Sequence, residues 1–74
     1  MTATLNHPVG SPVLDAHELA VLTLLADGLP IEAVARRLHL STRTVQRRIR
    51  RICDRLHVHA PIQAVVWAAR RELI

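Results

Sequence analysis

The sequence predicts an all-α fold in which four short helices form one compact domain. Apolar residues recur at helical intervals in four stretches, and no stretch shows the alternation typical of a β-strand. Residues that commonly begin or end helices stand between these stretches. The chain has 74 residues, 50% of them hydrophobic, which leaves room for a single small domain and argues against wholesale disorder.

The first two helices are marked by residues suited to their ends. Asp15 and Glu18 have the spacing of a capping box, and Gly28 suits the left-handed conformation that often ends a helix. Pro30 fits the first turn of a second helix that ends at Leu38, because proline's missing N–H costs nothing there. The apolar positions expected to face the core are Leu19, Val21, Leu22, Leu24, Leu25 and Ala26 in the first helix, and Ile31, Val34, Ala35 and Leu38 in the second.

The third helix is expected over about residues 42–57, after Ser41, a residue that caps helix starts well. Its apolar residues form a stripe about 100° wide, which is the width of a helix face that packs on a core. Arginines occupy the opposite side. We therefore expect the helix to turn its stripe inward and its arginines outward; the stripe consists of Val45, Ile49, Ile52, Cys53 and Leu56.

The two ends of the chain differ in character. A fourth helix is predicted to begin at Pro61, with a core stripe of Ile62, Val65, Val66, Ala69 and Leu73. Residues 1–13 contain Asn, Pro, Gly and Ser without periodicity, and are expected to be a flexible tail or the remnant of a linker. The folded domain is therefore expected over residues 14–74.

Charge is distributed unevenly along the chain, although the net charge is only +4. The segment from Arg36 to Arg55 holds eight of the ten arginines and a single acid, Asp54, and so carries +7. The remaining two arginines and five acids give −3. Segregated charge creates a local positive field, which attracts polyanions such as nucleic acids, or an acidic protein surface.

The spacing of the second and third helices predicts a helix-turn-helix within the four-helix domain. Only His39 and Leu40 separate the second helix from the Ser41 cap of the third. A short helix, a tight turn and a longer basic helix have the dimensions of this motif, whose second helix enters the DNA major groove, about 12 Å wide. Arginines would then meet phosphates and guanine edges, and backbone N–H groups near Ser41 would hold a phosphate.

The sequence resembles the LuxR-type, or GerE-type, helix-turn-helix domain, which is also the output domain of NarL-like response regulators. The resemblance runs from Leu14 to about Ile74. It implies a bacterial transcription regulator that binds double-stranded DNA sequence-specifically and forms a homodimer through its fourth helix. The residues whose joint spacing carries it are Leu14, Glu18, Val21, Leu22, Leu25, Ala26, Gly28, Leu29, Val34, Ala35, Leu38, Leu40, Ser41, Thr44, Val45, Ile52, Leu56, Val58, Ala64 and Val65.

The resemblance also implies which residues contact DNA. Base contacts are expected from Gln46, Arg47 and Arg50, and phosphate contacts from Thr44, Arg48 and the Ser41 backbone. The outward-face geometry adds two further phosphate contacts, Arg43 and Arg51. The chain departs from the family at Gln46, where Lys is usual, and at Arg48, where His is usual. These departures predict a preferred DNA sequence different from that of other members.

The fourth helix is expected to form the dimer interface through Ala64, Trp67, Ala68 and Arg71. An exposed Trp on a face of small residues is typical of an interface anchor. The alternative is that Trp67 lies over the edge of its own domain core.

Several other classes of function are not favoured. The single cysteine, Cys53, excludes an intrachain disulfide, and Cys53, His57 and His59 lack an obvious fourth metal ligand. No nucleophile or pocket indicates an enzyme, and no cofactor or small-molecule ligand is expected. No apolar run approaches the ~20 residues of a membrane span and no signal peptide is visible, so a cytoplasmic, nucleoid-associated protein is expected.

The alternative function is that of a protein-interaction module. Such a module would contact RNA polymerase, as region four of sigma factors does, or would pair with a longer regulator and block it. Binding to duplex DNA at moderate salt distinguishes the two hypotheses.

Overall fold

The structure is a computed structural model that describes residues 13–74, so all of the predicted tail except Val13 lies outside the described residues. This part of the chain forms four α-helices and contains no strand. The all-α prediction is therefore confirmed. The helices are α1 (Ala16–Ala26), α2 (Ile31–Leu38), α3 (Thr42–Leu56) and α4 (Pro61–Arg70).

The predicted capping box fixes the start of α1. The Asp15 carboxylate accepts a hydrogen bond from the Glu18 N–H at 2.8 Å, and the Glu18 carboxylate accepts one from the Asp15 N–H at 2.9 Å. Beyond the other end of α1, Gly28 has φ +88°, as predicted, in the left-handed region that glycine reaches without strain. The Leu29 N–H then donates to the Leu24 carbonyl at 3.2 Å, which closes the last turn.

A tight turn joins α2 to α3. Pro30 directly precedes α2 as its N-cap, one position earlier than predicted, where its missing N–H is equally harmless. His39 ends α2 in the left-handed conformation with φ 59°, and the Leu40 N–H donates to the Ala35 carbonyl at 2.8 Å. Ser41 then caps α3 by accepting a hydrogen bond from the Thr44 N–H at 3.1 Å.

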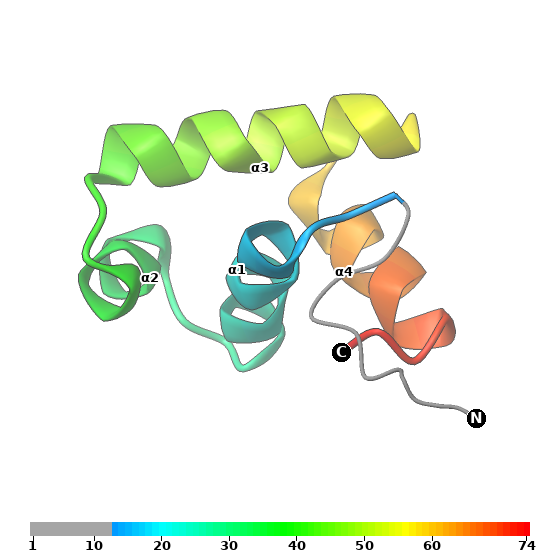
Figure 1. Cartoon of the computed structure of the whole chain (residues 1–74), viewed down its shortest axis with the longest axis horizontal. Helices are drawn as coiled ribbons and strands as arrows, with labels where there is room; N and C mark the ends of the chain where they lie inside the picture. Colours follow the sequence, from blue (N-terminus) through cyan, green and yellow to red (C-terminus); the bar gives the residue numbers. More distant parts are fainter. Residues whose placement is uncertain (1–12) are drawn as a thin grey trace.

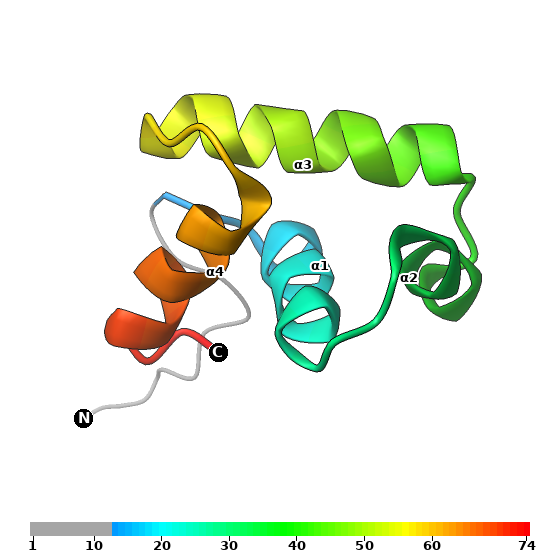
Figure 2. The ribbon, with the colours of Figure 1, turned by 180° about the vertical axis from the view of Figure 1, so that it is seen from behind.

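Helix α3 crosses the other three helices. Figure 1 shows α1, α2 and α4 side by side beneath it, and Figure 2 shows the same arrangement from behind. Helix α3 packs against all three of these helices. Its opposite long side is covered by no other helix of the described part. One long side of α3 is therefore left uncovered by the other described helices.

The core between the helices is aliphatic, and the predicted stripe of α3 faces it. Val45, Ile49, Ile52 and Cys53 are buried, and Leu56 packs against the core while half-buried. Helix α1 contributes Val21, Leu22 and Leu24, whereas Ala26, which was predicted to face inward, is exposed. Leu14, just before α1, is fully buried.

The predicted core stripe of α4 is wrong in its main part. Ile62 is 64% exposed and Val66 42% exposed, and Ala69 is exposed as well. The side chains that α4 buries are Ala64, Val65 and Ala68. The two polar side chains of α4, Gln63 and Arg70, lie on the side opposite Val65 and Ala68, so the buried face is the one turned away from them. Small side chains allow a closer approach between helices, which favours the alanine face where α4 packs against α1 and α3.

Candidate nucleic-acid interface

The uncovered side of α3 carries a row of long polar side chains, Arg43, Gln46, Arg47 and Arg50, called here the α3 row. All four are exposed, and together they line a hollow of about 330 Å³. Their spacing of three or four residues places them on one helix face. They offer three guanidinium groups and one amide, all rich in hydrogen-bond donors.

The length of the α3 row sets how much DNA it could span. Arg43 and Arg50 are seven positions apart, which corresponds to about 10 Å along a helix, or about three base pairs of duplex. A helix of this diameter fits the major groove, where guanine offers two acceptors to an arginine and adenine offers a donor and an acceptor to a glutamine.

The amino-terminal end of α3 points its free backbone amides outward. The Ser41 side chain accepts from the Thr44 N–H, and the Ser41 carbonyl accepts from the Val45 N–H at 3.1 Å. This capping leaves the amides of Thr42 and Arg43, which precede the first helical hydrogen bond, directed away from the helix. Ser41 is exposed and Thr44 half-buried. The end of α3 thus has the geometry that favours a phosphate.

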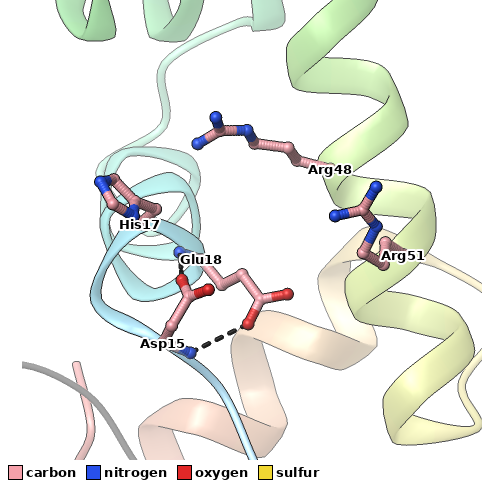
Figure 3. A pocket seen from close by; sticks show the side chains of 5 residues that line it. All are labelled: Asp15, His17, Glu18, Arg48 and Arg51. Carbon is pink, nitrogen blue, oxygen red and sulfur yellow. Dashed lines mark hydrogen bonds between the residues drawn. The ribbon is translucent and has the colours of Figure 1, made fainter.

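Two arginines of α3 lie beside the row rather than in it. Arg48 and Arg51 extend toward the start of α1, where they line a hollow of about 140 Å³ together with Asp15, His17 and Glu18 (Figure 3). We call this the flank hollow. Arg51 was predicted on the outward face, and the structure brings it to the side of α3 instead.

One arginine turns back onto the protein. The Arg55 guanidinium donates to the Glu18 carboxylate at 2.8 Å and to the Val13 carbonyl at 3.0 Å. Glu18 is only 5% exposed. The sequence does not predict this pair, because its members are 37 positions apart and no local pattern links them. The other seven arginines of the basic segment, Arg36 to Arg51, form no ion pair within the described residues.

Comparison with known families decides the assignment. The family model described as bacterial regulatory proteins, luxR family (GerE), matches residues 12–68, which is most of the chain. The chain belongs to the LuxR family. The expected resemblance is confirmed, and with it the helix-turn-helix, here α2 and α3. Comparison with curated proteins gave no match.

Membership gives this LuxR-family domain its general role, which is DNA binding in transcription regulation. The described part of the domain contains no group of three His, Cys, Asp or Glu side chains placed to hold a metal ion. Over the same residues, no helix is both long and apolar enough to cross a bilayer.

Cys53 behaves as a core residue of the LuxR-family domain. Its side chain is 7% exposed, at the base of a hollow of about 540 Å³ between α3 and the loop that leads to α4. Burial, followed by the nearby Asp54 carboxylate, raises the pKa of the Cys53 thiol above its usual range. The thiol is therefore neutral at physiological pH and unsuited to act as a nucleophile or a ligand.

The fourth helix requires a correction to the predicted dimer interface. Ala64 and Ala68 are 0% exposed within the domain, so neither is available to a partner, and the prediction is wrong for these two residues. Trp67 is half-buried and packs against the edge of the core, as the alternative interpretation held. The Arg71 guanidinium lies over its ring at 4.1 Å from the centroid and donates to the Trp67 carbonyl at 3.2 Å.

Proposed function

We propose that this domain binds double-stranded DNA sequence-specifically, with α3 in the major groove. The single observation that supports this most strongly is the α3 row, which carries three arginines without ion-pair partners in the described structure, on the one face of α3 that no described helix covers. Gln46, Arg47 and Arg50 lie in the middle and far part of that row and are assigned to bases.

The remaining polar groups of α3 are assigned to phosphates. Arg43 stands at the amino-terminal end of the row, next to the free amides that follow Ser41, and Thr44 lies one turn from the cap. Arg48 and Arg51 lie to the side of the row. Phosphate contacts on both sides of a recognition helix fix its position in the groove, while base contacts select the sequence.

We further infer that two copies pair through α4, which would place two recognition helices on two half-sites. The exposed apolar side chains of α4 support this, since Ile62 and Val66 are one turn apart on the same face. Trp67 and Arg71 lie on another side of α4, more than about 100° round the helix from this face, whereas Ala64 and Ala68 belong to the core. Such a dimer would act as a bacterial transcription regulator at the nucleoid.

Selection of bound sequences from a random duplex library tests the proposal. The selected duplexes are expected to share one sequence, and the domain should bind them at moderate salt. If no sequence were enriched and the chain captured RNA polymerase or a longer regulator instead, the protein-interaction alternative would be supported. The DNA-binding proposal would then be overturned.

Arg50→Ala is expected to reduce selectivity. An arginine bound to a guanine edge discriminates by about 1–3 kcal/mol, so the ratio of affinities for selected and random duplex should fall about tenfold. Arg36→Ala removes the same charge from exposed α2 and should leave the ratio unchanged. Fluorescence anisotropy with both duplexes measures the ratio. If Arg50→Ala kept the wild-type ratio, Arg50 would not be a base contact.

Val66→Glu is expected to weaken self-association about tenfold or more, because it places a carboxylate at the centre of the exposed apolar face. Sedimentation velocity over a concentration series, with and without a two-half-site duplex, measures the effect. Ala26→Glu introduces the same charge at an exposed position on another helix, α1, and serves as the control. Equal association by both variants would place the interface elsewhere.

A further inference from the structure

The flank hollow brings basic groups from two helices together. Arg48 and Arg51 extend from α3, and His17 comes from the first turn of α1 (Figure 3). His17 and Arg48 also line a neighbouring hollow of about 260 Å³, together with Ala20, Leu38 and Leu40. His17 and Arg48 therefore both line each of the two hollows, although they are 31 positions apart in the sequence.

The acids of the flank hollow are already occupied. The Asp15 carboxylate accepts from the Glu18 N–H, and the Glu18 carboxylate accepts from the Asp15 N–H and from Arg55. Neither carboxylate forms an ion pair with Arg48 or Arg51 in the described structure. The two guanidinium groups therefore keep their donors for an external anion, and guanidinium forks match the oxygens of a phosphate.

The backbone of α1 adds to this positive character. The capping box uses the amides of Asp15 and Glu18, and the Leu19 N–H donates to the Asp15 carbonyl at 3.0 Å. The amides of Ala16 and His17 lie between them, ahead of the first helical hydrogen bond, at the positive end of the helix dipole. Side chains and backbone thus favour the same kind of ligand.

We propose that the flank hollow lies against the DNA backbone, with one phosphate held by His17 and Arg48 and the neighbouring phosphate by Arg51. The inference rests on the proposed function, because both phosphates belong to the strand that borders the groove occupied by α3. The new element is α1, because the sequence predicts phosphate contacts from α3 and its cap alone. A contact from His17 ties a second helix to the same strand and fixes the orientation of the domain in the groove.

A charge placed at His17 tests the site. His17→Glu is expected to weaken binding about tenfold on selected and random duplexes alike, since a phosphate contact carries no sequence information. Ala26→Glu changes the other end of α1 by one exposed carboxylate and should stay within about twofold of wild type. A glutamate in the first turn suits the helix dipole, so His17→Glu should fold, and circular dichroism checks this.

A neutral phosphate analogue supplies the second arm. Methylphosphonate is placed at one backbone position at a time in the selected duplex. At one position the replacement is expected to weaken the binding of the wild-type protein about tenfold. The same replacement should weaken the binding of the Arg48→Ala variant by less than about twofold, because this variant already lacks the guanidinium that pairs with the phosphate. His17→Arg should strengthen binding and steepen its dependence on salt.

The outcomes separate this inference from the proposed function. Binding of no duplex at all would overturn both. Two results would overturn the flank phosphate site alone. One is that His17→Glu and Ala26→Glu weaken duplex binding equally, and the other is that no methylphosphonate position shows coupling to Arg48→Ala. Either result would leave the assignment of α3 to the major groove intact.

Discussion

Raising the salt concentration from about 50 to about 200 mM is expected to weaken duplex binding about 40-fold for one domain, and by more than about a thousandfold for a dimer on two half-sites. Each phosphate neutralised by an arginine releases bound counterions and contributes about −0.9 to the slope of log affinity against log salt. Arg43, Arg48 and Arg51 give a slope of about −2.7 per domain. Anisotropy titrations at four or five salt concentrations measure it.

Single substitutions show which arginines produce the slope. Arg43→Ala, Arg48→Ala and Arg51→Ala should each reduce its magnitude by about 0.9. Arg55→Ala is the matched control, because its guanidinium is engaged with Glu18 and Val13 and should leave the slope nearly unchanged. Affinity that stayed flat between the two salt concentrations would contradict phosphate binding by this face.

Glu18→Ala is expected to lower the free energy of unfolding by about 2–3 kcal/mol, roughly a 30–150-fold change in the ratio of folded to unfolded protein. Glu18 is nearly buried and satisfies two donors, the Asp15 N–H and Arg55. Its removal leaves the Asp15 N–H without this acceptor, leaves Arg55 with the Val13 carbonyl alone, and opens a small void. This expected loss in the free energy of unfolding is small for a broken buried ion pair, because the Arg55 side chain is 42% exposed and water screens its charge. Urea denaturation followed by circular dichroism measures the change.

Glu18→Gln distinguishes the two parts of this effect. The amide oxygen can still accept from the Asp15 N–H, so the loss should be less than half of that for Glu18→Ala. The cycle of Glu18→Ala, Arg55→Ala and the double variant isolates the energy of the pair. A loss below about 0.5 kcal/mol for Glu18→Ala would show that the capping box and the ion pair contribute little to stability.

The features predicted correctly from sequence are those fixed by neighbours along the chain. The capping box at Asp15, the left-handed Gly28 and the Ser41 cap each depend on contacts within a few residues. The inward stripe of α3 was also predictable, because the twelve positions from Val45 to Leu56 alternate sharply between apolar and polar groups at helical spacing. Local chemistry determines these elements almost completely.

The features that sequence analysis missed depend on packing between distant segments. Apolar residues occupy most of the circumference of α4, and its inward face depends on how closely Ala64 and Ala68 let it approach its neighbours. Arg55 resembles the other arginines of α3 until the fold brings Glu18 beside it. His17 gains its place next to Arg48 in the same way. Assembly of the helices creates these contacts, and no short motif encodes them.

The stacking of Arg71 on Trp67 has an optical consequence. The chain contains one Trp and no Tyr or Phe, so this indole is its sole intrinsic fluorophore. It sits on α4, half-covered by the core and by a guanidinium 4.1 Å from its centre, whereas the arginines assigned to DNA extend from α3. Ultraviolet emission from the unlabelled protein is therefore expected to monitor unfolding at α4, while groove contacts by α3 leave the chromophore's surroundings unaltered.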